Sequence, residues 1–182
     1  MSANLFTGTL VRLTSGRDEA VMWARWSHDT QYLRLLDSEP QQPTTEARIR
    51  KEGNNQKLPD GKGFGFDIRM LADDRLLGFV YLGVMSWIDR DAWVAIGIGD
   101  RESWDEGYGT DAMRVALRYT FDELHLHRVS LTVFGNNARA MRSYEKAGFK
   151  REGQVRESML RDGEFIDTVH MGVLKTEWIG SC

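Results

Sequence analysis

The segment from Gly107 to Leu124 constrains the fold more strongly than any other part of this sequence. It opens with two glycines in the pattern Gly-x-Gly. Its second half carries largely apolar residues at helical spacing, namely Met113, Ala116, Leu117, Thr120, Phe121 and Leu124. The apolar run at 92–98 directly before it is typical of a buried strand. A strand, a glycine turn and a helix in this order leave unpaired backbone N–H groups at the helix start, and these can bind an anion such as a phosphate.

A Gly-x-Gly pair at a helix start is by itself a weak signal, because most such pairs only lead a loop into a helix. Composition excludes several other kinds of site. A net charge of −3 argues against a nucleic-acid partner. The one cysteine, Cys182, excludes an internal disulfide and a multi-cysteine zinc site, and the four histidines form no HExxH pattern. We therefore expect no metal.

Length and hydropathy set the expected organisation and compartment. A chain of 182 residues suits one domain covering 1–182. No apolar run approaches the roughly 20 residues that a membrane helix needs, and the first residues show no secretory leader. We expect a cytoplasmic protein with no membrane partner.

The remaining patterns predict an α/β fold with a mixed, mostly antiparallel sheet. Apolar runs predict strands at 10–13, 64–70, 76–87, 93–98, 129–133, 155–160 and 165–174. Helices are expected at 18–28, at 46–50 with Thr44 or Thr45 as cap, after Gly107, and from Asn137 to Gly148. Asp162-Gly163 between two strand-like runs predicts a hairpin. The crossover from 93–98 to 129–133 makes those two strands parallel neighbours.

Two runs of residues resemble the GNAT superfamily of N-acetyltransferases. The run from Ile96 to Glu102, with Trp104 and Gly107-Tyr108-Gly109-Thr110-Asp111-Ala112, resembles the acetyl-CoA-binding motif of that family. The run Leu131-Thr132-Val133, Asn137-Ala138-Arg139-Ala140 and Tyr144-Glu145-Lys146-Ala147-Gly148-Phe149 is similar to the motif that follows it there. Trp104 and the Asn-x-Arg-Ala spacing resemble the branch that contains ribosomal-protein N-terminal and spermidine acetyltransferases. The resemblance covers roughly residues 11–174 and implies six to seven strands, about four helices and a central parallel pair that splays apart.

The resemblance also implies a cofactor site for acetyl-CoA as cosubstrate. The pyrophosphate would lie on the backbone N–H groups around Gly107, Tyr108, Gly109 and Thr110, at the positive end of the helix dipole. The pantetheine arm would lie beside Ile96, Gly97 and Ile98, where a backbone N–H polarises the thioester carbonyl. Gly97 and Gly99 fit a bulge or a close approach at this place. Trp104 and Asn137 complete the implied set of cofactor-binding residues.

Tyr144 is the catalytic residue that the resemblance implies. It lies seven positions after Asn137, so both share one helix face, and in relatives the tyrosine hydroxyl reaches the cofactor sulfur. The amine attacks the acetyl group directly. A phenol with a pKa near 10 is not driven to protonate a thiolate with a pKa near 8.5, so hydrogen-bond stabilisation of the thiolate is the larger expected part, with full proton transfer left open. The alternative is a packed aromatic residue on an amphipathic helix.

The sequence does not single out the base that deprotonates the attacking amine. The candidates are Asp67, Asp89, Asp100, Glu102, Glu157 and His170, with or without a bridging water. Asp105-Glu106 is a departure, since relatives usually carry Gly-Lys or Gly-Arg there. Two carboxylates beside a pyrophosphate are unfavourable unless they point to solvent. Asp105 could instead cap the helix, or both could face a cationic substrate.

Two classes of function remain open. The first is an N-acetyltransferase for a primary amine, which could be a protein N-terminus, a polyamine, an amino acid or an amine antibiotic. The second is a non-catalytic module of the same fold that binds coenzyme A. A nucleotide-binding enzyme is disfavoured because Gly-Tyr-Gly-Thr lacks the Gly-Lys-Ser/Thr ending of a P-loop. The aromatic residues could cover a homodimer interface, and the segment 38–63 is either a linker or a specificity segment.

Overall fold

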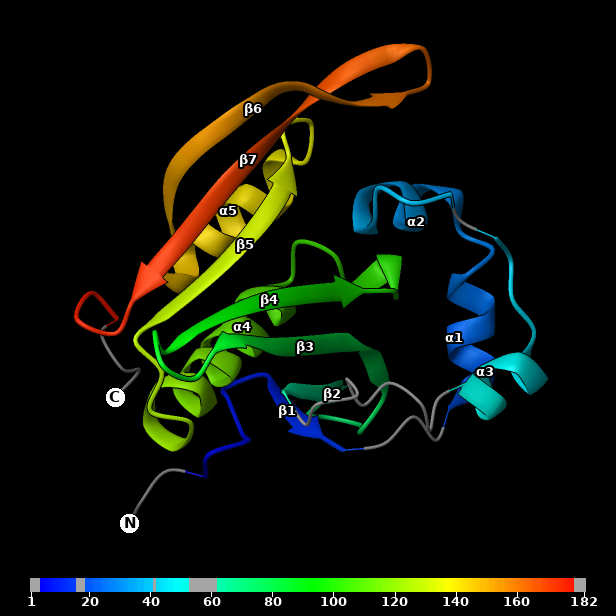
Figure 1. Ribbon diagram of the computed structural model, residues 1–182. Helices are drawn as coiled ribbons and strands as arrows, with labels where there is room; N and C mark the ends of the chain where they lie inside the picture. The colour runs from blue at the N-terminus through cyan, green and yellow to red at the C-terminus, as the bar shows by residue number, and fades with distance from the viewer. Residues whose placement is uncertain (1–3, 16–18, 41, 53–61, 179–182) are drawn as a thin grey trace.

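A seven-stranded sheet in the order β1-β2-β3-β4-β5-β7-β6 organises the protein (Figure 1). The computed structural model describes residues 4–15, 19–40, 42–52 and 62–178. The strands are β1 Val11–Thr14, β2 Gly63–Met70, β3 Leu76–Ser86, β4 Asp91–Ile98, β5 Arg128–Phe134, β6 Lys150–Arg161 and β7 Glu164–Leu174. The helices are α1 Ala20–Trp26, α2 Thr30–Leu36, α3 Glu46–Glu52, α4 Tyr108–Arg118 and α5 Ala138–Ala147, with a 3-10 turn Arg101–Ser103 and a π-helical turn Tyr119–Glu123. Asp18, Pro59 and Cys182 lie outside the described residues.

The sheet is antiparallel except at its centre. Strands β1 to β4 form an antiparallel meander, and β5 pairs with β7 and β7 with β6 in the same sense. The one parallel pair among the described strands is β4 with β5. This confirms the predicted mixed, mostly antiparallel sheet and the crossover through α4, because parallel neighbours need such a connection.

The parallel pair separates soon after it begins. Its register covers Asp91 with Arg128, Ala92 with Val129, and Trp93 with Ser130. Beyond these pairs β4 stays paired with β3, and β5 with β7, so the two strands diverge, as Figure 1 shows. The predicted splay is therefore present, and it leaves a wedge between the C-terminal halves of β4 and β5.

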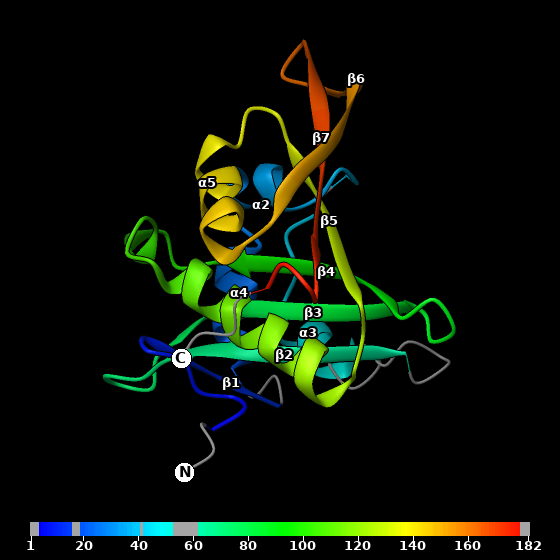
Figure 2. The ribbon, with the colours of Figure 1, turned by 90° about the vertical axis from the view of Figure 1, so that its left-hand side faces the viewer.

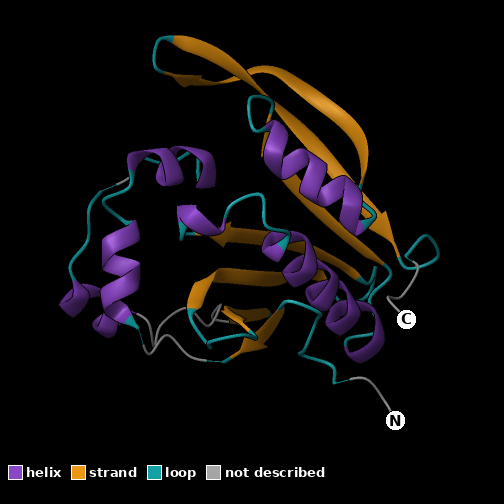
Figure 3. Cartoon of the chain, turned by 180° about the vertical axis from the view of Figure 1, so that it is seen from behind, coloured by secondary structure: helices purple, strands orange, loops and turns teal. Residues whose placement is uncertain are grey.

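Helices α4 and α5 cover one face of the sheet and lie in front of it when the molecule is viewed from behind (Figure 3). Helix α4 buries its apolar side against β1, β3 and β4. Its residues Met113 and Leu117 are fully inaccessible to solvent, and burying a side chain of this size contributes about 1.5–3 kcal/mol. Figure 2 shows the two helices side by side along this face, and α5 carries the face that borders the wedge.

Helices α1, α2 and α3 gather beyond the C-terminal end of β4 (Figure 1). They enclose a second apolar cluster built on Trp26, Tyr32 and Leu76. Helix α2 is one more helix than the sequence indicated. The side chain of Asp29 caps it by accepting hydrogen bonds from the N–H groups of Gln31 and Tyr32. In α3 the cap is Thr45, whose hydroxyl accepts a bond from Arg48 N at 3.3 Å.

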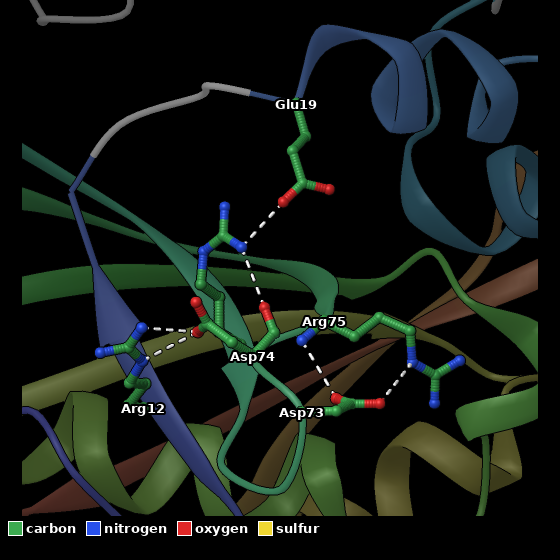
Figure 4. A network of polar contacts seen from close by, with 6 residues as sticks. Arg12, Glu19, Asp73, Asp74 and Arg75 are labelled. Atoms are coloured by element: carbon green, nitrogen blue, oxygen red, sulfur yellow. Dashed lines mark hydrogen bonds and ion pairs between the residues drawn. The ribbon is translucent and has the colours of Figure 1, made fainter.

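A polar network holds the start of α1 against the strands (Figure 4). Arg69 on β2 donates from Nη1 to Glu19 Oε1 at 2.8 Å and to Asp74 O at 3.0 Å. Arg12 on β1 binds the Asp74 carboxylate, and Arg75 reaches Asp100 after β4 at 2.7 Å. The network thereby joins α1 to the β2–β3 turn and to the end of β4.

The last two strands form a long hairpin. Strand β6 is longer than the predicted 155–160, because its pairing with β7 continues past irregularities between Arg151 and Gly153 and between Val155 and Met159. The turn at Asp162 and Gly163 has φ values of 52° and 84°, which confirms the predicted hairpin. None of the helices in the described residues combines the length and apolar character needed to cross a membrane.

Candidate active site

A cleft occupies the wedge between β4 and β5. Its walls are α2, the end of β4, the loop leading into α4, the first turn of α4 and one side of α5. The structure brings every predicted site residue to this cleft. They are Ile96, Gly97, Ile98, Trp104, Gly107, Tyr108, Gly109, Thr110, Asn137 and Tyr144.

The start of α4 offers backbone N–H groups to this cleft. Gly107 is the N-cap residue, with φ of 87°, and it makes no side-chain cap. The first helical bond joins Asp111 N to Gly107 O at 3.0 Å. Among the described residues no acceptor pairs with the N–H groups of Tyr108, Gly109 or Thr110. Such a helix start is suited to a phosphate.

Asp105 does not cap α4, so that interpretation was wrong. Gly107 occupies the N-cap position in a left-handed conformation, and Asp105 itself has φ of 65°. Both Asp105 and Glu106 are exposed, and Asp105 lines the edge of the cleft. The two carboxylates therefore remain hydrated beside the anion site.

Trp104 connects the end of β4 with α5. Its indole Nε1 donates to Ile98 O at 2.7 Å. The guanidinium carbon of Arg139 lies 3.4 Å from the centroid of the Trp104 ring, which is a close cation–π contact. Burial lowers the pKa of Arg139 from its usual value, and the nearby Asp105 raises it in part. Trp104 thus holds both the free end of β4 and a cation at the cleft.

Gly97 and Gly99 mark a close approach and not a bulge. The β3–β4 register runs without interruption through the pair Phe79–Gly97. A Cβ atom on Gly97 would lie 2.8 Å from Tyr32 Oη, and one on Gly99 would lie 2.1 Å from Trp26 Cδ2. Only glycine lets α1 and α2 pack this closely on the end of β4.

Asn137 and Tyr144 lie along the side of α5 that faces the cleft. Asn137 is the N-cap, and its Oδ1 accepts a bond from Ala140 N at 3.1 Å. Two turns later, burial raises the pKa of Tyr144 to about 12, with a smaller opposing effect from Arg139. The phenol therefore keeps its proton at neutral pH and can donate a hydrogen bond.

Several cleft residues were missed by the sequence reasoning. Arg139, Arg142 and Lys146 of α5 bring positive charge to the cleft, and their spacing of three and four positions on one helix was a usable signal. Ser143 lies 2.8 Å from Thr110, hydroxyl to hydroxyl, and ties α5 to the start of α4. The sequence analysis did not predict helix α2, so it could not predict that α2 forms one wall of the cleft.

None of the candidate bases lines the cleft. Asp100 accepts hydrogen bonds from Arg75 and Ser103, each at 2.7 Å, and Asp89 accepts one from Ser86. Asp67 is buried in β2 and His170 is exposed on β7. Glu102 and Glu157 are also exposed and away from the cleft. Within the described residues no group of three His, Cys, Asp or Glu side chains could hold a metal ion.

Known proteins share both the sequence and the fold. The model of the acetyltransferase (GNAT) domain matches residues 9–150. The chain is 34% identical over 125 residues to the probable N-acetyltransferase YjcK of Bacillus subtilis, covering 67% of each protein. It is 32% identical over 108 residues to the spermidine N(1)-acetyltransferase of Vibrio cholerae, covering 59% of this chain and 62% of that protein. It is 25% identical over 153 residues to the L-amino acid N-acetyltransferase AaaT of Escherichia coli, covering 82% and 94%.

A solved structure has a similar fold. The spermidine N-acetyltransferase of Vibrio cholerae in complex with CoA and spermine superposes with a TM-score of 0.77, at 24% identity, over 92% of this chain and 95% of that one. The family match extends from just before β1 to the start of β6 and so includes both motifs and the whole wedge. The chain belongs to the GNAT acetyltransferase family, whose members take the acetyl group from acetyl-CoA.

Proposed function

We propose that the protein is an N-acetyltransferase that moves the acetyl group of acetyl-CoA to a primary amine within a ternary complex. One observation carries this proposal: the uncapped start of α4, the edge of β4 that β5 leaves unpaired and the side of α5 that bears Tyr144 meet in a single cleft. An anion site, a strand edge and a hydrogen-bond donor for the leaving thiolate are the parts that binding and cleaving a CoA thioester requires.

The cofactor would extend from α4 along β4. Its pyrophosphate accepts hydrogen bonds from the N–H groups of Tyr108, Gly109 and Thr110. Its pantetheine arm pairs with the edge of Ile96–Ile98 that β5 leaves free. Arg139, Arg142 and Lys146 supply positive charge along the same cleft. These α5 cations offset the carboxylate of Asp105, where relatives have a cation in the neighbouring position.

The chemical step is a direct transfer. The neutral amine nitrogen attacks the carbonyl carbon, while a backbone N–H of the 96–98 segment stabilises the developing oxyanion. The C–S bond then breaks, the thiolate of coenzyme A leaves, and the amine loses its proton to water. Burial raises the pKa of Tyr144 to about 12, above the usual value of about 8.5 for a thiol, so transfer of its proton to that thiolate is unfavourable. Tyr144 therefore stabilises the thiolate by donating a hydrogen bond.

An amine panel tests the proposal directly. We expect free thiol to appear from acetyl-CoA with at least one amine among peptides with free N-termini, amino acids, polyamines and simple alkylamines. Product mass should rise by one acetyl group. Calorimetry should show acetyl-CoA binding that weakens when Gly109 is changed to Pro, since the substitution removes one N–H from the helix start. Failure to bind acetyl-CoA would refute both the cofactor site and the reaction.

A non-catalytic CoA-binding module is the second candidate. Two observations favour it: no candidate base lines the cleft, and Asp105 lies at its edge. Tight acetyl-CoA binding with no thiol release across the whole amine panel would support the non-catalytic module and refute the acetyltransferase proposal.

A further inference from the structure

A second pocket adjoins the cleft, and we infer that it holds a large apolar group attached next to the reacting amine. The acceptor is then a primary monoamine with an aromatic or branched aliphatic substituent, and not a polyamine. We call this the α1–α3 pocket. Its aromatic and aliphatic lining is Trp23, Trp26, Tyr32, Leu33, Leu36, Pro40 and Ile49, and Ser27, Gln42, Thr44 and Arg48 complete its walls. The inference rests on the proposed function, because it names the acceptor of that same site.

The α1–α3 pocket begins where the reaction would take place. Tyr32 and Leu36 line both this pocket and the cofactor cleft. Their side chains lie directly over Gly97, since a Cβ atom there would be 2.8 Å from Tyr32 Oη and 3.0 Å from Leu36 Cδ1. Gly97 belongs to the strand segment beside which the thioester is proposed to lie. The part of the pocket bounded by Tyr32 and Leu36 therefore adjoins the strand segment where the acetyl carbon is proposed to lie.

The walls of the pocket are aromatic and firmly packed. Trp26 and Tyr32 are 4% and 5% exposed. The rings of Trp23 and Trp26 meet edge to face with centroids 5.3 Å apart, and Trp23 also packs on Phe79 at 5.4 Å. The packed aromatic and aliphatic side of the pocket favours an apolar guest, and burying a leucine- or phenylalanine-sized group against it should increase affinity roughly ten- to hundredfold.

The charges around the pocket disfavour a polyamine. Arg48 is the one charged side chain among the described residues that line it. The adjoining cavity between α2 and the β6–β7 turn is lined by Arg34, Arg161 and Asp162, and Asp162 is already paired with Arg34. The second ammonium of a polyamine would find no carboxylate in the pocket, and an unpaired buried charge is strongly unfavourable.

The aromatic and aliphatic lining of the pocket also bears on how the acceptor amine loses its proton. An amine taken out of water favours its neutral form, which is the form that attacks. A pocket that desolvates the acceptor therefore assists its deprotonation without any of the candidate bases, none of which lines the cleft. A polyamine held by carboxylates would be kept protonated by them.

An acceptor comparison tests this inference at a fixed saturating acetyl-CoA concentration. Phenylethylamine and a peptide with phenylalanine as first residue should each give a kcat/KM at least tenfold higher than spermidine and putrescine. The ratio between phenylethylamine and the peptide decides whether the natural source is a free amine or a chain end. A kcat/KM for spermidine or putrescine above that of both apolar acceptors would overturn the inference and leave the acetyltransferase proposal intact.

Filling the pocket gives a second measurement. Leu33→Trp places an indole in the pocket at a residue that does not line the cofactor cleft. It should lower kcat/KM for phenylethylamine at least tenfold and leave both kcat/KM for methylamine and the Kd of acetyl-CoA within twofold. Val21→Trp is the matched control, because Val21 lies on α1, is 56% exposed and lines neither pocket. Equal loss for both amines, or none, would contradict the inference.

A binding measurement tests the pocket assignment independently of whether the protein acetylates any amine. Calorimetry of phenylethylamine with the CoA-loaded protein should show binding that Leu33→Trp weakens and Val21→Trp does not. If no amine is acetylated yet this pattern is seen, the acetyltransferase proposal fails and the pocket stands. If phenylethylamine does not bind, the pocket assignment is wrong whatever the outcome of the amine panel.

Discussion

At the scale of single residues, the proposed chemistry depends on two features. Tyr144 keeps its proton, and none of the candidate bases lines the cleft. Burial raises the pKa of Tyr144 to about 12, so the phenol remains a hydrogen-bond donor at neutral pH. In the proposed reaction coenzyme A leaves as a thiolate, and a hydrogen bond to a charged acceptor is worth about 1.5–3 kcal/mol. The tyrosine is thus suited to stabilise a leaving group and unsuited to act as a base.

Replacing Tyr144 by Phe should lower kcat roughly ten- to hundredfold, because the hydrogen bond to the thiolate is lost while the ring remains. The Kd of acetyl-CoA should change less than threefold. Steady-state thiol release and calorimetry measure the two quantities. Undiminished kcat in the variant would assign Tyr144 to the packed-aromatic alternative.

The pH dependence should follow the acceptor and not the enzyme, since no candidate base lines the cleft. We expect kcat/KM to rise about tenfold per pH unit up to the pKa of the free amine. That value is near 8 for a peptide N-terminus and near 10 for an alkylamine. Profiles for the two kinds of acceptor should therefore bend about 2 pH units apart. A bend at one common pH for both acceptors would reveal an enzyme base.

At the scale of elements, the start of α4 is held in place from behind. Asp111 is buried in the first turn of α4, and its carboxylate accepts bonds from Thr9 Oγ1 and from the N–H groups of Thr9, Leu10 and Val11, at 2.8–3.1 Å. This contact ties the helix to the segment that enters β1. It orients the amides of Tyr108, Gly109 and Thr110 from the side opposite the cleft.

Changing Asp111 to Asn should destabilise the protein by about 2 kcal/mol, because the amide NH2 group faces N–H donors that need an acceptor. The midpoint of urea unfolding should fall accordingly. Acetyl-CoA affinity should fall too if the helix start moves. Asp122→Asn is the control, since Asp122 is exposed on the following turn, and it should change stability by less than 0.5 kcal/mol. Equal midpoints for the two variants would refute this role.

Sequence reasoning predicted the strand, glycine turn and helix around the cleft, because these depend on local patterns. It missed α2, a helix of seven residues whose apolar side has no strong period by itself and is fixed by contact with Trp26 and Gly97. It also assigned Asp105 a capping role that the left-handed Gly107 takes over. The α1–α3 pocket could not be predicted from the sequence either, because it forms only when three short helices pack together.

At the scale of the whole molecule, the polar network of Figure 4 sets where the helical wall stands relative to the sheet. The Arg69 side chain is only 14% exposed and bridges Glu19, at the start of α1, to the β2–β3 turn. The Arg12–Asp74 pair on the outer side is 44% and 55% exposed. The inner contact should therefore matter more, since exposed pairs contribute at most about 1 kcal/mol.

Arg69→Met should lower the free energy of unfolding by roughly 1–2 kcal/mol and raise the KM of the amine more than the Kd of acetyl-CoA, because α1 forms the acceptor wall and not the phosphate site. Arg12→Met is the matched comparison and should cost less than 1 kcal/mol with no change in either constant. Urea unfolding and initial rates provide the readouts. A larger loss in Arg12→Met would reverse this ranking.

The three residue pairs that join β4 to β5 have a mechanical consequence. They divide seven strands into a block of four and a block of three that share one short seam, with α4 resting on the first block and touching α5 across the gap. A molecule seated in the cleft touches β4 of the first block and α5, which follows β5. We therefore expect a bound cosubstrate to stiffen the sheet by bridging the gap beside this short seam.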